Sequence, residues 1–90
     1  MSKLFYEYYR KDNGNLKGVV MAIDKGVYGW AMCDPKDQFS KERGLNIAYN
    51  RALKARELNE EERAKYYSTI PHSLRSLFNK IEERANRYYK

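Results

Sequence analysis

The sequence lacks the features that define several protein classes. It has a single cysteine, Cys33, so no internal disulfide can form, which favours a reducing compartment such as the cytoplasm. No apolar run approaches the roughly 18–20 residues that a membrane-spanning helix requires. Residues 1–7 contain neither a long apolar core nor the small-residue cleavage site of a signal peptide. We therefore expect a cytoplasmic protein that does not associate with membranes.

Residues suited to catalysis or metal binding are also scarce. The one histidine, His72, is far from Cys33 in the sequence, and one Cys with one His argues against a tetrahedral metal site. Asp34, Asp37 and Glu42 are carboxylates that can hold a divalent ion, but the first two also suit the start of a helix. Nucleotide-binding glycine loops and a serine-centred elbow are absent. We expect a non-enzymatic protein without a cofactor or metal, in which Cys33 is buried and His72 lies at the surface or caps a helix.

The first third of the chain has the pattern of three strands. Residues 4–9 are rich in aromatic side chains, residues 18–23 are almost continuously apolar, and residues 27–33 form a third apolar run. Asn13-Gly14 and Asp24-Lys25-Gly26 are turn sequences that can join these strands as hairpins. The pattern predicts an antiparallel meander over residues 1–33.

Details of the pattern indicate how the meander packs. Val19, Met21 and Ile23 alternate along the second strand and should share one face. Gly18 and Gly29 lie within strands, where glycine usually marks a bulge or the close approach of a neighbour. Such a sheet needs helices to cover a face.

The remainder of the chain, residues 34–90, has the pattern of helices. Asp34 and Pro35 suit a helix start, Gly44 suits a break, and residues 45–57 carry apolar side chains at helical spacing, including three alanines that predict close packing on the sheet. Asn59 before three glutamates predicts a short helix over residues 60–67. A final helix follows from the spacing of Leu74, Leu77, Phe78, Ile81, Ala85 and Tyr88. We predict one α+β domain over residues 1–90, with two or three helices packed on one face of the meander.

Basic charge and tyrosine are both abundant. The net charge is +6 and nine residues are tyrosine, a combination found in nucleic-acid-binding proteins and in protein interfaces. One candidate group of binding residues surrounds the first helix: Lys36, Lys41, Arg43, Arg51 and Lys54. A second candidate group lies near the C-terminus: Arg84, Arg87 and Tyr89. A scattered charge of this kind is also typical of an ordinary solvated surface.

Several short segments carry a resemblance to a known group of proteins. They are Gly18-Val19-Val20-Met21-Ala22-Ile23, Gly29-Trp30-Ala31-Met32-Cys33, Lys36-Asp37-Gln38-Phe39-Ser40-Lys41, Gly44, Ile47-Ala48 and Arg51-Ala52. Through them the chain resembles small uncharacterised proteins encoded by bacteriophages and prophages. The resemblance implies an accessory protein that acts inside a bacterial host cell, where such products commonly bind host proteins or block host defences.

Two functions are consistent with these observations. In the first, the protein binds and modulates or inhibits a host protein, for example a defence enzyme or a protein–nucleic-acid complex. In the second, Lys and Arg contact nucleic-acid phosphates while Tyr and Trp stack on bases. We favour the first because acidic residues dilute the basic ones. A homodimer, formed through the open edge of the first strand or through the last helix, is a further expectation.

Overall fold

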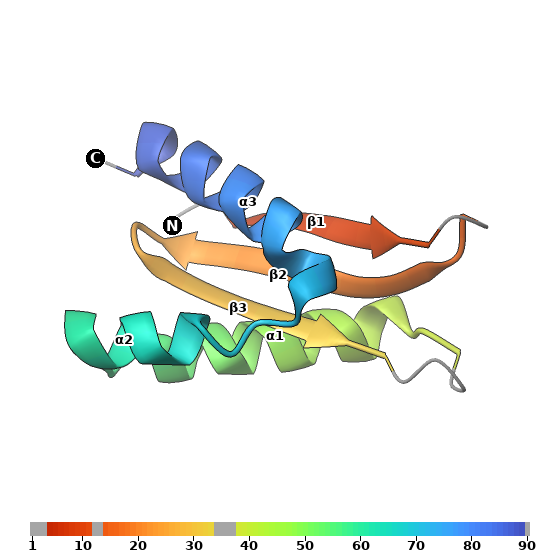
Figure 1. Ribbon diagram of the computed structural model, residues 1–90, viewed down its shortest axis with the longest axis horizontal. Coiled ribbons are helices and arrows are strands. Elements are labelled where there is room, and N and C mark those ends of the chain that lie inside the picture. Colours follow the sequence, from red (N-terminus) through yellow and green to blue (C-terminus); the bar gives the residue numbers. More distant parts are fainter. Residues whose placement is uncertain (1–3, 12–13, 34–37, 90) are drawn as a thin grey trace.

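A three-stranded antiparallel sheet followed by helices forms the protein. The computed structural model describes residues 4–11, 14–33 and 38–89. The strands are β1 (Phe5–Arg10), β2 (Leu16–Asp24) and β3 (Val27–Met32), in the spatial order β1-β2-β3. The helices are α1 (Lys41–Arg56), α2 (Glu60–Tyr67) and α3 (Arg75–Tyr88), with a short 3₁₀ turn, η1 (His72–Leu74), before α3 (Figure 1). The α+β class and the meander are confirmed.

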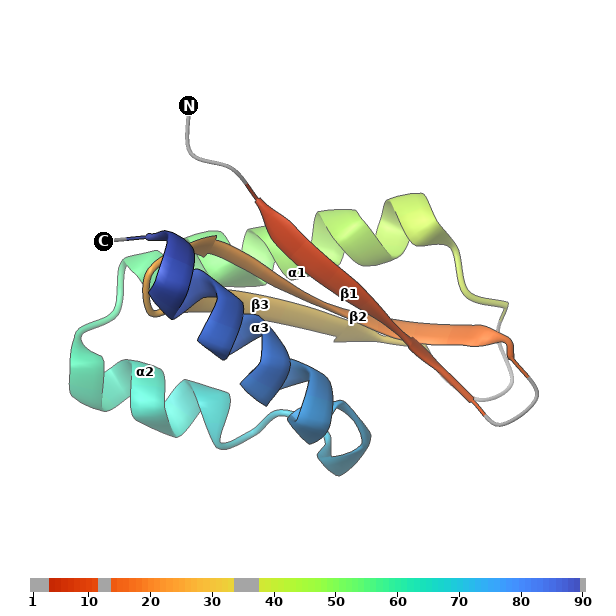
Figure 2. The same cartoon turned by 90° about the horizontal axis from the view of Figure 1, so that it is seen from above.

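The helices cover both faces of the sheet. Figure 2 shows α1 on one side of the sheet and α2 and α3 on the other. Val19, Met21 and Ile23 pack with α1, whereas Val20 and Ala22 pack with α3. The prediction that all helices lie on one face is wrong. The unbroken apolar run of β2 is the physical reason, because alternate residues of a strand point to opposite faces and both sets are apolar here.

Helix α1 lies unusually close to the sheet. Its contact positions are alanines, and Ala48, Ala52 and Ala55 are fully buried. Opposite them on β3 is Gly29, where an added Cβ would collide with the Ala48 carbonyl oxygen and lie 2.6 Å from the Ala52 nitrogen. Small residues on both elements therefore allow the helix backbone to approach the strand backbone. The expected close approach at Gly29 is confirmed.

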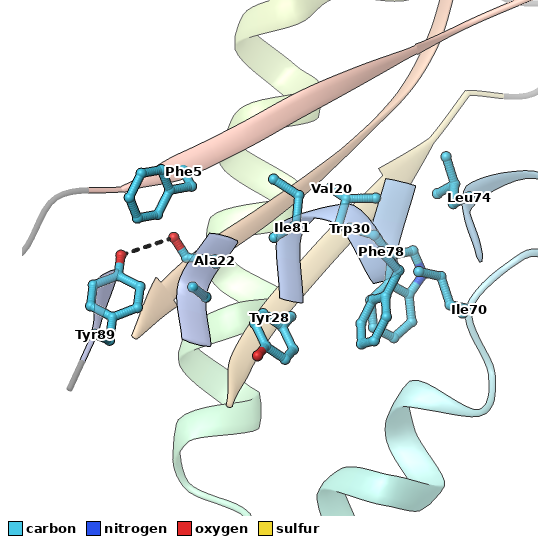
Figure 3. Close-up of a cluster of buried hydrophobic side chains, with 11 residues drawn as sticks. Phe5, Val20, Ala22, Tyr28, Trp30, Ile70, Leu74, Phe78, Ile81 and Tyr89 are labelled. Carbon is cyan, nitrogen blue, oxygen red and sulfur yellow. Dashed lines mark hydrogen bonds between the residues drawn. The ribbon is translucent and has the colours of Figure 1, made fainter. Parts of the chain in front are cut away.

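The second core lies between the sheet and α3. Tyr28 and Trp30 of β3 pack with Leu74, Phe78 and Ile81, and the side chains interdigitate across the two layers (Figure 3). Tyr28 and Phe78 meet edge to face with their ring centroids 5.1 Å apart, a favourable aromatic geometry.

The two C-terminal tyrosines have the opposite burial from that predicted. Tyr88 is 52% exposed, whereas Tyr89 is buried at 7% and its hydroxyl donates to the Ala22 carbonyl oxygen at 3.5 Å. Helix α3 ends at Tyr88 and Tyr89 is extended, with φ −85° and ψ 113°. This change of direction brings the Tyr89 ring to 5.7 Å from the ring of Phe5, so helical spacing does not predict its position.

The helix starts follow capping rules. Ser40 caps α1 by accepting a hydrogen bond from the Arg43 N–H, and the helix continues through Gly44 without the expected break. Asn59 and Glu62 form a reciprocal capping box at α2, which confirms the predicted start. The predicted roles of Asp34, Pro35 and Asp37 fall outside the described residues, as does the Asn13 half of the first turn. Gly14 and Gly26 have positive φ, as tight turns require.

We predict that Gly29→Ala destabilises the fold strongly. The added methyl group meets the backbone of α1 rather than a flexible side chain, so the helix must move away from β3. We expect the free energy of unfolding to fall by about 3 kcal/mol or more, the upper range for overpacking. Urea unfolding followed by circular dichroism measures the change.

Gly14→Asn is the matched control. Nothing lies within 4 Å of a Cβ at Gly14, and asparagine tolerates its positive φ. Its stability should stay within about 1 kcal/mol of the wild type. A Gly29→Ala protein as stable as this control would show that α1 does not pack closely on β3.

Candidate partner-binding surface

Side chains close most of the outer edge of β3. The Tyr67 hydroxyl accepts a hydrogen bond from the Tyr28 N–H at 3.0 Å and donates one to the Gly26 carbonyl oxygen at 2.7 Å. Arg51 Nη1 donates to the Trp30 carbonyl oxygen at 2.7 Å. These backbone groups would otherwise be available to pair with another strand. Addition of a strand along β3 from Gly26 to Trp30 is therefore blocked.

The closed part of the edge ends at Met32. Backbone groups alternate in direction along a strand, so Met32 projects its N–H and C=O outward as Tyr28 and Trp30 do. Within the described ranges, no group hydrogen-bonds to these Met32 atoms. The end of β3 thus combines a 36%-exposed apolar side chain with backbone groups that no described residue binds.

Two hollows flank Met32. The first, of about 190 Å³, is bounded by the end of β3, the segment before α1 and the first two turns of α1: Ala31, Met32, Cys33, Gln38, Phe39, Ser40, Arg43, Gly44 and Ile47. The second is an open hollow of about 400 Å³ between β3 and α2: Trp30, Met32, Arg51, Tyr66, Thr69 and Pro71. Met32 forms part of both, so the hollows adjoin along the sheet edge.

We name the area around them the β3–α1 surface, defined by Met32, Arg43, Ile47, Arg51 and Tyr66. Ile47 is 38% exposed although it is apolar, and it lies between two arginines along α1. The half-buried Tyr66 ring packs on Trp30 with centroids 5.0 Å apart. Burial raises the pKa of Tyr66, and the positive charge of Arg51 lowers it by a smaller amount. The Tyr66 hydroxyl therefore stays neutral at physiological pH. Arginine, methionine and tyrosine around exposed apolar side chains are typical of protein interfaces.

The first predicted group of basic residues is only partly brought together. Arg43 and Arg51 border the two hollows. Lys54 is exposed and lies one turn beyond Arg51 on α1. It follows Ile47 by seven residues, which is two helical turns, so it lies on the same side of the helix. Lys41 lies elsewhere, with its Nζ 5.6 Å from the centre of the Tyr8 ring. Lys36 lies outside the described residues.

Each residue of the second predicted group contacts another part of the chain. Arg84 Nη1 lies 3.0 Å from a Glu7 carboxylate oxygen and its guanidinium lies 4.8 Å from the Phe5 ring centre. Arg87 pairs with Glu83 at 3.7 Å within α3. Tyr89 is buried, which corrects the prediction that its ring is offered to a partner. Since α1 and α3 lie on opposite faces of the sheet, the two groups belong to separate surfaces.

The residues considered for chemistry are dispersed. Cys33 is half-buried and lines the first hollow rather than the core, which corrects that prediction, and its N–H donates to the Lys17 carbonyl oxygen. His72 is exposed in η1, and no hydrogen bond joins it to Cys33. The part of the chain that the structure describes contains no group of three or more His, Cys, Asp or Glu residues placed to hold a metal. Of the described helices, none has the length and apolar character that crossing a bilayer requires.

Sequence reasoning missed three members of the β3–α1 surface: Met32, Ile47 and Tyr66. A signal was present for Ile47, an apolar residue among Arg43, Asn50, Arg51 and Lys54 on the side of α1 predicted to be polar. Tyr66 could not be found in this way, because its position depends on how α2 packs beside β3.

Comparison with known proteins gives no assignment: no family model, no curated protein and no solved structure matches the chain.

We predict that Tyr67→Phe costs about 1–3 kcal/mol of stability, since both the Tyr28 N–H and the Gly26 C=O lose their partner in a part-buried site. Tyr66→Phe is the matched control, because no described residue hydrogen-bonds to the Tyr66 hydroxyl. Urea unfolding of the two variants measures the difference. Equal stability of both variants would contradict the proposed closure of the edge by Tyr67.

We also predict that stability falls in alkali. Burial raises the pKa of Tyr28 to about 12 from its ordinary value of 10.0, and it also raises the pKa of Tyr67. Above pH 10 the unfolded chain loses these protons while the folded chain keeps them, so the free energy of unfolding decreases as the pH rises from 10 to about 12. Urea midpoints measured at neutral pH and through this window test the prediction. A constant midpoint would show that Tyr28 is not desolvated.

Proposed function

We propose that the protein is a non-enzymatic binding protein that recognises an acidic protein partner through the β3–α1 surface. The observation that carries this proposal is the meeting of exposed apolar side chains, Met32 and Ile47, with Arg43 and Arg51 around two adjoining hollows. An apolar side chain of a partner fits the first hollow, and partner carboxylates fit the arginines at its margin. Arginine suits this role because its guanidinium donates two parallel hydrogen bonds to a carboxylate.

Charge favours the same class of partner. The chain has a net charge of +6, which attracts an acidic surface over distance and accelerates encounter. Arg51 is already oriented by its hydrogen bond to Trp30, so a partner that contacts it loses less side-chain freedom. The bacteriophage-type context implied by the resemblance adds that the partner is a protein of a bacterial host.

Nucleic-acid binding is the second candidate, favoured by Arg43, Arg51 and Lys54 on one side of α1. The rings that base stacking requires are less suitably placed. Trp30 is 5% exposed and Tyr89 is 7% exposed, and Tyr66 packs on Trp30. The C-terminal arginines are engaged with Glu7 and Glu83. Contact with phosphate alone would give weak binding without base preference.

The proposal predicts that the double variant Arg43→Glu/Ile47→Asp loses partner binding. The experiment captures a partner from a bacterial lysate treated with nuclease, purifies it and measures its affinity for the wild type by calorimetry. The double variant should bind at least about 10-fold more weakly, equivalent to about 1.4 kcal/mol. Arg51 is left unchanged because it also supports β3.

Arg87→Glu is the control, because it also changes one exposed cation to an acid, but on the opposite face of the sheet. It should bind as the wild type does. Equal weakening by both variants would indicate an effect of net charge alone and would contradict a specific β3–α1 surface. Loss of the partner on nuclease treatment, together with salt-dependent binding of the purified protein to DNA or RNA, would support the second candidate instead.

A further inference from the structure

The two edges of the sheet, β3 and β1, differ in whether side chains bind their outward N–H and C=O groups. The outward groups of β3 belong to Tyr28 and Trp30, as their bonds to Tyr67 and Arg51 show. Their neighbours on β2, Ala22 and Val20, therefore direct their N–H and C=O to β1. There Ala22 faces Phe5 and Val20 faces Glu7, and Gly18 likewise faces Tyr9, so the β1 residues between these positions direct their N–H and C=O away from the sheet. Those residues are Tyr6 and Tyr8.

This edge of β1 is open. No group in the described ranges hydrogen-bonds to the outward N–H or C=O of Tyr6 and Tyr8. Figure 2 looks onto the edge, with β1 crossing in front of β2. Helix α1 packs on β3 and β2, so on that face of β1 Leu4 is 42% exposed and Tyr6 is 46% exposed. An open strand edge with exposed apolar and aromatic side chains is a site for pairing with another strand.

We propose that a second copy of this chain pairs with the edge, β1 against β1 in antiparallel register about a two-fold axis, to form a six-stranded sheet. The register has Tyr6 opposite Tyr6 of the second copy and Leu4 opposite Tyr8 of the second copy. These pairs bring the exposed side chains of Leu4 and Tyr6 together with the half-buried Tyr8, on the face that carries α1 but beyond the strands that α1 covers. Aromatic–apolar cross-strand pairs of this kind are favourable. The same surface on both copies satisfies the symmetry of a two-fold dimer.

Charge complementarity on the opposite face supports the register. The register sets Glu7 of the second copy directly across from Phe5. The Arg84 guanidinium lies 4.8 Å from the centre of the Phe5 ring, close to this pair. Arg84 already binds Glu7 of its own chain at 3.0 Å through Nη1, and its other donors can meet the second carboxylate. Each arginine would then lie between two glutamates, once on each side of the axis. A register centred on Glu7 would instead set two carboxylates directly opposite each other, which is unfavourable.

Sedimentation equilibrium of the full chain over a range of concentrations tests the dimer. The wild-type mass should rise from 10.8 kDa towards twice that value as the concentration increases. Tyr6→Pro removes the outward N–H and no hydrogen bond between β1 and β2, so it should stay at the monomer mass with an unchanged circular dichroism spectrum. Tyr6→Val retains the N–H and should still dimerise. A wild type that stays monomeric at every concentration, or a Tyr6→Pro protein that dimerises as tightly as the wild type, would overturn the proposal.

Cross-linking tests the register and does not depend on the proline variant folding. In a Cys33→Ser background, Tyr6→Cys places two thiols opposite each other with Cα atoms about 5.5 Å apart, within disulfide range. It should form a covalent dimer under mild oxidation. Glu7→Cys in the same background should not, because its Cα atoms would be more than about 7 Å apart. Cross-linking through position 7 but not through position 6 would overturn the proposed register.

Discussion

The burial of β2 on both of its faces is the constraint on which the structure depends. Val19, Val20 and Ala22 are completely inaccessible, and neighbours in this run belong to different cores. A chain of 90 residues has few ways to cover two faces of a sheet. It does so with α1 on one face and the α2–α3 segment on the other, so both cores share one central strand.

This arrangement also creates the candidate surface. Because Gly29 and the alanines bring α1 close to β3, the side of the helix reaches past the edge strand, and Arg51 can bind the Trp30 carbonyl group. On the other face α2 brings Tyr67 to the same edge. The edge is therefore closed from Gly26 to Trp30 by one helix from each layer. Among the described residues it opens at Met32, which borders both hollows.

Local patterns predicted the elements well and their assembly less well. Alternating and helical spacing, the Gly26 turn and the Asn59 cap each depend on neighbouring residues, so the strands and most helix positions followed from the sequence. The number of sheet faces covered by helices was not predicted correctly, although the unbroken apolar run of β2 contained that information. Of the candidate site, Arg43 and Arg51 were predicted, whereas Tyr66 depends on tertiary packing. Tyr89 was misjudged because Phe5, which lies far away in the sequence, packs against its ring, and the ion pair of Arg84 with Glu7 depends on the same tertiary packing.

Hydrogen exchange of the β2 amides, followed residue by residue by NMR, tests the two-faced burial most directly. Val19 and Met21 direct their N–H groups to β3, and Val20 and Ala22 direct theirs to β1. With both faces covered, all four amides should exchange only through global unfolding, with the same free energy of opening. If Val19 and Met21 exchanged through a much smaller local opening than Val20 and Ala22, α1 would not be firmly docked, and the burial of β2 on both faces would be contradicted.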